Sequence, residues 1–172
     1  MKSETLQNRC KKIKLVATDV DGVLTDGGRY YSGTGEQLKK FHVRDGMAVN
    51  ILLRNNIKTL ILTKEKSSIT KKWAKDMNVT QVFAGYAKKE NALNLICKKY
   101  KVSLENLAYI GDDVNDLNVL RKVGLSAAPK NADSQVKKIV NFTCKNKAGD
   151  ACFREFIEII LFSKYSSDIK WY

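Results

Sequence analysis

The 172-residue sequence lacks several features that would assign it to a specialised class of protein. No apolar run reaches the length of a membrane-spanning helix, and a single proline excludes collagen-like or proline-rich material. The four cysteines form no Cys-x-x-Cys pair or zinc-binding spacing, and the only histidine, His42, has no second ligand nearby. The N-terminal segment lacks the apolar core of a secretory signal, so we expect a cytoplasmic protein with reduced thiols.

Charge of one sign is in excess, with 31 Lys and Arg against 18 Asp and Glu and a formal net charge of +13. Such an excess attracts anions, including nucleic acids, acidic membrane surfaces and phosphorylated small molecules. The lysines are scattered as pairs, without a dense basic arm or the aromatic–basic interleaving that stacks bases. We therefore interpret most of this charge as solvated surface and expect neither nucleic acid nor membrane as a partner.

Short apolar runs alternate with longer segments of helical periodicity along the chain. The runs predict strands at residues 14–18, 59–62, 79–83, 107–110, 125–128 and 140–143. The longer segments predict helices at residues 45–54, 67–77, 89–100, 114–123, 133–139 and 151–164. Residues 29–31 and 37–41 flank a glycine-containing turn and predict a β-hairpin.

This alternation predicts parallel βαβ units, and hence an α/β fold with a doubly wound, Rossmann-like parallel sheet. A chain of this length, with 44% hydrophobic residues and no linker, predicts one domain over residues 1–172. Ligands bind beyond the carboxyl ends of the strands in such a sheet. Polar residues directly after the apolar runs are therefore the first candidates for a functional site.

Two acidic clusters follow two of the predicted strands. Asp19 and Asp21 lie two residues apart and point to the same side of an extended chain. A second cluster, over residues 111–116, contains Asp112 and Asp113. Carboxylates this close repel one another unless one is protonated or a cation binds, and hard oxygen ligands suit Mg²⁺. Either cluster alone could cap a helix, but two clusters at two strand ends predict a metal site.

Four segments resemble the motifs of the haloacid dehalogenase superfamily of phosphatases. The superfamily motifs, in order, are matched by Asp19-x-Asp21-Gly22, by Thr63, by Lys89 and by residues 111–116. The chain resembles more closely the small phosphatases of 2-keto-3-deoxy sugar acid phosphates. These act on 3-deoxy-D-manno-octulosonate (Kdo) 8-phosphate or on nine-carbon, sialic-acid-type 9-phosphates. This closer likeness involves residues 21–27, 40–46, 108–113, 129–132 and 149–155.

The two branches of that subfamily are not separated by the sequence. Lys64-Glu65, after Thr63, looks like the nine-carbon branch, whereas Arg44-Asp45 looks like the Kdo branch. A carboxylate at Glu65 would accept hydrogen bonds from substrate hydroxyl or amide groups, although an exposed Glu could equally pair with a surface lysine. The substrate is therefore expected to be an eight- or nine-carbon sugar acid phosphate.

The resemblance implies a Mg²⁺-dependent phosphatase with residues in defined roles. Asp19 would attack phosphorus, and Asp21 would act as general acid and base. Mg²⁺ would be held by the carboxylates of Asp19 and Asp112 and by the main-chain carbonyl of Asp21. The residues expected to bind phosphate or substrate are Gly22, Thr63, Glu65, Lys89 and Arg44.

Members of this superfamily usually carry a cap domain over the site, and the present chain has no room for one. The resemblance implies that hairpins instead pack together in a homotetramer, so that a neighbouring copy closes the site. Two other functions stay open from the sequence. One is a catalytically inactive relative or basic nucleic-acid-binding module, and the other is a broad-specificity small-molecule phosphatase.

Overall fold

The computed structural model describes residues 4–172. The N-terminal segment, which we expect not to be a secretory signal, therefore has its first three residues outside the described part. Six parallel strands form one sheet in the order β5-β4-β1-β6-β7-β8. These strands are β1 Leu15–Thr18, β4 Lys58–Thr63, β5 Gln81–Ala84, β6 Leu107–Ile110, β7 Leu125–Ala128 and β8 Phe142–Thr143. The predicted doubly wound α/β fold is therefore confirmed.

Seven α-helices and three 3₁₀ turns lie in the described residues. The helices are α1 Leu6–Lys12, α2 Val43–Arg54, α3 Ser68–Asp76, α4 Leu93–Tyr100, α5 Leu117–Leu120, α6 Ser134–Lys137 and α7 Cys152–Tyr165. The turns are η1 Lys89–Ala92, η2 Leu104–Asn106 and η3 Val114–Asp116. Within residues 4–172, no helix has both the length and the apolar character needed to cross a membrane.

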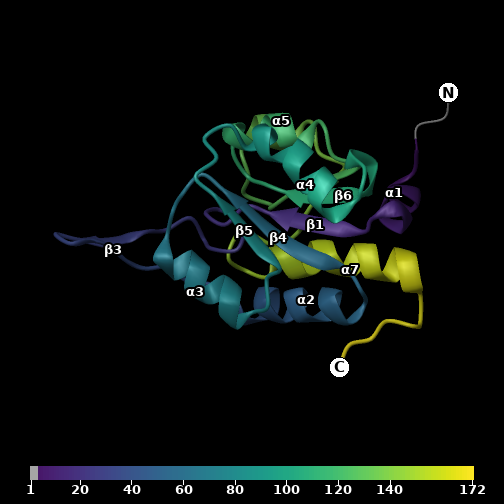
Figure 1. Ribbon diagram of the computed structural model, residues 1–172, viewed down its shortest axis with the longest axis horizontal. Coiled ribbons are helices and arrows are strands. Elements are labelled where there is room, and N and C mark those ends of the chain that lie inside the picture. The colour runs from purple at the N-terminus through teal and green to yellow at the C-terminus, as the bar shows by residue number, and fades with distance from the viewer. Residues whose placement is uncertain (1–3) are drawn as a thin grey trace.

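Side chains of the central strands divide the core into two layers. On β1, Val16 joins a cluster with residues of α1, α2, α3 and α7, whereas Leu15 and Ala17 join a second cluster with α4, α5 and α6. Figure 1 shows α2, α3 and α7 below the sheet and α4 and α5 above it. Because both faces of β1 are covered, all four of its residues are buried, as its unbroken apolar run predicted.

Several helices begin at a different residue from the one predicted, because hydrogen bonds with capping side chains determine where a helix starts. The helix predicted from Asp45 begins at Val43, because Nδ1 of His42 accepts the N–H of Arg44 at 3.2 Å and caps it. Ser67 caps α3 as predicted. The helices predicted from Lys89 and from Val114 both begin as 3₁₀ turns. Helix α1 was not predicted.

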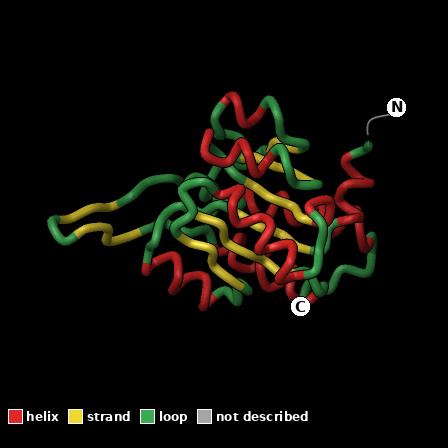
Figure 2. The backbone as a smooth tube through the Cα atoms, turned by 45° about the horizontal axis from the view of Figure 1, so that its top comes forward, coloured by secondary structure: helices red, strands yellow, loops and turns green. Residues whose placement is uncertain are grey.

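The predicted hairpin consists of β2 Tyr30–Ser32 and β3 Gly35–Leu38, and it projects away from the body of the molecule (Figures 1 and 2). Tyr30, Tyr31 and Leu38 are 58%, 62% and 62% exposed. Beyond β3, Phe41 turns back and stacks on Trp73, with ring centroids 4.6 Å apart. The hairpin segment therefore combines exposed apolar side chains at Tyr30, Tyr31 and Leu38 with one inward-facing aromatic residue, Phe41.

Candidate active site

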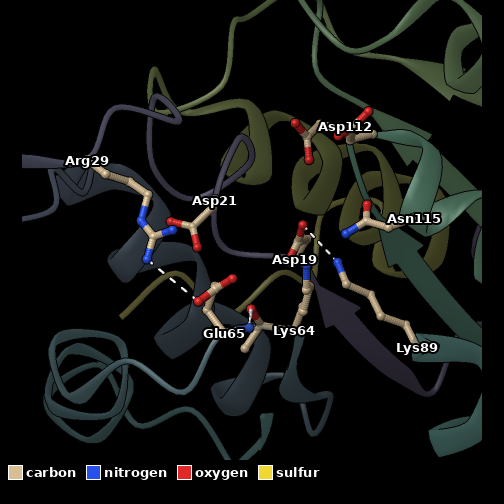
Figure 3. Close-up of a pocket in the computed structure, with 10 residues that line it drawn as sticks. Asp19, Asp21, Arg29, Lys64, Glu65, Lys89, Asp112 and Asn115 are labelled. Carbon is tan, nitrogen blue, oxygen red and sulfur yellow. Dashed lines mark hydrogen bonds and ion pairs between the residues drawn. The ribbon is translucent and has the colours of Figure 1, made fainter. Parts of the chain in front are cut away.

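The carboxyl ends of β1, β4 and β6 meet at one edge of the sheet, where a cavity of about 230 Å³ opens. Thr18 at the end of β1 lies beside Ile110 at the end of β6, so the residues that follow these strands are brought together. The lining residues are Asp19, Asp21, Arg29, Thr63, Lys64, Glu65, Lys89, Asp112, Asp113 and Asn115. Figure 3 shows Asp19 between Lys89, Asn115 and Asp112 on one side and Asp21, Arg29 and Glu65 on the other.

Lys89 is buried in the floor of this pocket between two carboxylates. Its Nζ lies 2.8 Å from Asp19 Oδ2 and 2.7 Å from Asp116 Oδ1, and Tyr109 donates its hydroxyl to the same Asp116 oxygen at 2.6 Å. Burial lowers the pKa of Lys89, but the neighbouring charges of Asp19 and Asp116 raise it above its ordinary value. Lys89 therefore stays cationic, and Asp116 fixes it against Asp19.

The geometry of Asp19 and Asp112 fits a divalent cation. Oxygens of Asp19, Asp112 and Asp116 lie within 4.8 Å of one another. Those of Asp116 are already bonded to Lys89 and to the Asp112 amide, whereas Asp112 Oδ1 is buried without a hydrogen-bond partner among residues 4–172. An unpartnered buried carboxylate oxygen is costly unless the group is protonated or a cation binds. Asp112 therefore offers an unpartnered oxygen close to Asp19, whose Oδ2 is paired with Lys89, and these are the two carboxylates expected to hold Mg²⁺.

Burial also raises the pKa values of the Asp19 and Asp112 carboxyl groups. Burial raises the pKa of Asp19 to about 7, with Lys89 opposing and Asp116 reinforcing the shift. Burial, with the charges of Asp19 and Asp116, raises the pKa of Asp112 to about 8. Asp19 is 5% exposed, so water screens these charges little.

Gly22 brings the loop after β1 against the acidic cluster. Its φ is +89°, and a Cβ built on it would lie 2.0 Å from Asp112 Oδ2. A glycine is needed here both for the left-handed backbone and for the close approach of main chain to carboxylate. Gly22 does not line the pocket itself.

Asp21 directs its side chain toward the hairpin rather than toward the other acids. Lys39 Nζ donates to both of its carboxylate oxygens, at 2.6 and 2.8 Å. The Asp21 carboxylate is therefore outside the group of acids that could surround a cation. This arrangement leaves only the main chain of Asp21 as the expected ligand.

Thr63 and Glu65, two residues apart, line the pocket at the end of β4. Thr63 ends β4, and its hydroxyl accepts the N–H of Glu65 at 3.2 Å. Glu65 is partly exposed and lies 3.6 Å from an Arg29 nitrogen, so its partner is an arginine of the pocket and not the surface lysine that the sequence allowed. Both residues lie where the motif placed them.

Arg44 lies elsewhere. It lines a separate cavity of about 260 Å³ beside the N-terminal end of α7, together with Arg154 and Glu155. As the second residue of α2, it does not line the pocket that holds Asp19 in its own chain, so its contact with substrate stays a prediction.

Two basic residues of the site escaped sequence reasoning. Arg29 lines the pocket, and Lys39 binds Asp21 without lining it. Both come from the hairpin segment, whose path over the site is set by packing at long range. In a chain with 31 basic residues, neither position carries a local signal.

Comparison with known proteins gives one consistent result. A family model described as haloacid dehalogenase-like hydrolase matches residues 49–156. The curated 3-deoxy-D-manno-octulosonate 8-phosphate phosphatase of Haemophilus influenzae is 37% identical over 164 residues, which cover 95% of this chain and 91% of the relative. Its Escherichia coli counterpart is 32% identical over 160 residues, covering 93% and 85%.

Solved structures agree with this assignment. The cobalt-bound H. influenzae phosphatase has a TM-score of 0.89 at 37% identity, with 92% of this chain and 93% of that chain covered. The Moraxella catarrhalis phosphatase, in complex with magnesium, phosphate and Kdo, has a TM-score of 0.90 at 32% identity, with 94% and 93% covered. The chain therefore belongs to the haloacid dehalogenase-like hydrolases and, among them, to the family of the Kdo 8-phosphate phosphatases.

Proposed function

We propose that this chain is a Mg²⁺-dependent phosphomonoesterase that hydrolyses the phosphate ester of a 2-keto-3-deoxy sugar acid of the Kdo 8-phosphate type. The observation that carries the proposal is the pocket floor, where Asp19 lies 2.8 Å from Lys89 and close to the unpartnered Asp112 oxygen. Relatives named as Kdo 8-phosphate phosphatases support the substrate class. The complete acidic set argues against an inactive relative, and a pocket rich in carboxylates argues against binding a phosphate backbone.

Asp19 is the proposed nucleophile. A phosphate monoester is inert, so the site must align the attacking group and neutralise charge. One Asp19 oxygen attacks phosphorus, the bond from phosphorus to the sugar oxygen breaks, and an aspartyl-phosphate remains. Lys89 and the Thr63 hydroxyl hold the phosphate oxygens. Bound Mg²⁺, held by Asp19, Asp112 and the Asp21 carbonyl, would supply further neutralisation of the phosphate charge.

Asp21 is the proposed general acid and base. A sugar alkoxide leaves poorly without a proton, and Asp21 delivers one to the departing oxygen. It then takes a proton from the water that hydrolyses the aspartyl-phosphate, which releases inorganic phosphate and regenerates Asp19. The Asp21 side chain lines the same pocket as Asp19, which supports this division of roles.

Glu65 and Arg29 form the wall that we propose reads the sugar acid. Their side chains lie 3.6 Å apart and are 40% and 33% exposed, so both are open to a ligand. Glu65 repels a carboxylate and accepts hydrogen bonds from hydroxyl or amide groups, whereas Arg29 attracts a carboxylate. Nine-carbon acid 9-phosphates are therefore proposed to be turned over at least comparably to Kdo 8-phosphate.

The proposal extends to a homotetramer in the cytoplasm. The exposed aromatic and aliphatic side chains of the hairpin support association, because apolar surface of this kind is buried in stable interfaces. Sedimentation equilibrium tests the tetramer. A monomer at micromolar concentration with full activity would remove it from the proposal.

Substitution of the nucleophile tests the function. We expect Asp19→Asn to lower kcat for phosphate release from Kdo 8-phosphate by at least about 1,000-fold while leaving the fold intact. Exposed Asp76, which pairs with Lys72, provides the matched control Asp76→Asn and should keep full activity. EDTA should abolish activity and Mg²⁺ should restore it. Activity that survives either Asp19→Asn or exhaustive chelation would contradict the proposal.

A further inference from the structure

Lys39, directly after β3, is buried beside the pocket. The exposed fraction of its side chain is 0%, and Nζ donates to Asp21 Oδ1 at 2.6 Å and to Oδ2 at 2.8 Å. The same nitrogen lies 3.4 Å from Glu36 Oε1. Within residues 4–172, both hydrogen bonds to the Asp21 carboxylate come from Lys39. The orientation of Asp21 is thus set by one residue of the hairpin segment.

Glu36 ties Lys39 into a network of ion pairs. Its Oε1 accepts from Arg29 Nε at 2.9 Å, and its Oε2 accepts from the Ser67 hydroxyl at 2.8 Å. Asp21, Glu36 and Glu65 thereby face Lys39 and Arg29, three negative charges against two positive ones. Because Glu36 shares the charge of Lys39, the main effect of Lys39 on Asp21 is on its position.

Anchoring of the hairpin alone does not explain a buried lysine. Burying an ammonium group costs several kcal/mol before its ion pairs are counted, and an apolar side chain anchors a loop without that cost. The chain already provides such an anchor next to this position, where Phe41 stacks on Trp73 at 4.6 Å. The lysine therefore has a use that an apolar residue could not serve.

We propose that Lys39 is a positioning residue for the reaction, holding the Asp21 carboxyl group at the place from which it serves the leaving oxygen. The proposal rests on the function proposed above for Asp21. Lys39 itself does not line the pocket, so it acts through Asp21 and not by touching the substrate. Loss of Lys39 should weaken proton delivery while leaving attack by Asp19 in place.

Leaving groups of different basicity separate these two effects. 4-Nitrophenolate departs with little help from an acid, whereas phenolate, of similar shape, needs more. The ratio of kcat/KM for 4-nitrophenyl phosphate to that for phenyl phosphate therefore reports proton delivery. This parameter covers steps up to leaving-group departure, so hydrolysis of the aspartyl-phosphate does not enter it.

The test compares Lys39→Met with its neighbour Lys40→Met. Methionine fills the space of the lysine hydrocarbon stem and removes the donor group, and Lys40 is exposed with Nζ 3.8 Å from Asp26. We expect Lys39→Met to raise the ratio about tenfold, within the usual contribution of a general acid. Lys39→Arg should give an intermediate ratio, and Lys40→Met the wild-type ratio. If Lys39→Met does not fold, Lys39→Gln is measured in the same way.

An equal fall for both substrates, or an unchanged or smaller ratio, would show a purely structural Lys39 and overturn the proposal. Asp21→Asn separates this failure from failure of the proposed function. If Asp21→Asn raises the ratio and the Lys39 variants do not, only the role of Lys39 is wrong. If Asp21→Asn leaves the ratio unchanged, both roles are wrong. The double variant should raise the ratio no further than Asp21→Asn alone.

Discussion

Binding of Mg²⁺ to this site should release protons. In the metal-free protein, burial raises the pKa of Asp19 to about 7 and that of Asp112 to about 8. A cation binds the ionised carboxylates, so protons held by these groups must leave when it enters. The prediction therefore concerns the metal and the two acids together, and it can be measured without substrate.

The size of the effect follows from the two pKa values. At pH 7, Asp19 is about half protonated and Asp112 is mostly protonated, so roughly 1.4 protons leave for each Mg²⁺ bound. Since each released proton changes the binding constant about tenfold per pH unit, the apparent Kd should fall on the order of 500-fold between pH 6 and pH 8. Above about pH 9, affinity should level off, because both carboxylates are then already ionised.

Isothermal titration calorimetry at pH 7 in two buffers of different ionisation enthalpy measures the protons released. Asp45→Asn is a matched control, because burial raises the pKa of Asp45 to about 7 as well but Asp45 lies outside the pocket. This variant should release the wild-type number of protons. Asp112→Asn should lose most of the release together with affinity. Tight Mg²⁺ binding with no proton release at pH 7 would refute the reasoning.

Three further predictions concern single positions. Asp45 is fully buried with a raised pKa, so its contribution to the unfolding free energy should fall by up to roughly 4 kcal/mol from pH 4 to pH 8. Urea unfolding should show a fall with pH that is larger by this amount in the wild type than in Asp45→Asn, since Asp19 and Asp112 contribute to both proteins, and parallel curves would contradict it. Gly22→Ala should abolish Mg²⁺ binding by its clash with Asp112, whereas Gly27→Ala, with a similar positive φ but only ordinary contacts at 3.8 Å, should not. Calorimetry measures Mg²⁺ binding by both variants, and an equal loss of affinity in the two would contradict the prediction. Glu65→Arg should shift kcat/KM toward Kdo 8-phosphate over a nine-carbon acid 9-phosphate, and an unchanged ratio would mean that Glu65 does not read the sugar.

The parts of the fold that were predictable from the sequence are those with local determinants. Strand β6 occupies Leu107–Ile110, as its apolar run predicted, because a strand buried on both faces needs apolar side chains without interruption. The same run fixes where Asp112 emerges. Acidic residues after two adjacent parallel strands must meet, whatever the intervening chain does.

Features that depend on long-range packing were not predictable. Arg44 and Arg29 are each basic residues on the connection between β1 and β4, and only Arg44 lies in a segment that resembles the family. The capping of α2 by His42 carries Arg44 toward α7, whereas the hairpin brings Arg29 back over the pocket. Assigning either residue from sequence requires the path of the hairpin, which local propensity does not specify.

The balance of charge in the pocket differs in sign from that of the whole chain. The pocket is lined by five acidic and three basic side chains, although the protein carries a formal net charge of +13. With all of these groups ionised, the lining is two charges negative, so it repels a phosphate dianion until a divalent cation makes it neutral. The basic surface acts at longer range and raises the local concentration of anions without discriminating among them. The basic surface thus attracts the substrate, whereas the pocket residues bind its phosphate. Only phosphate binding in the pocket depends on a metal ion bound to the acidic cluster.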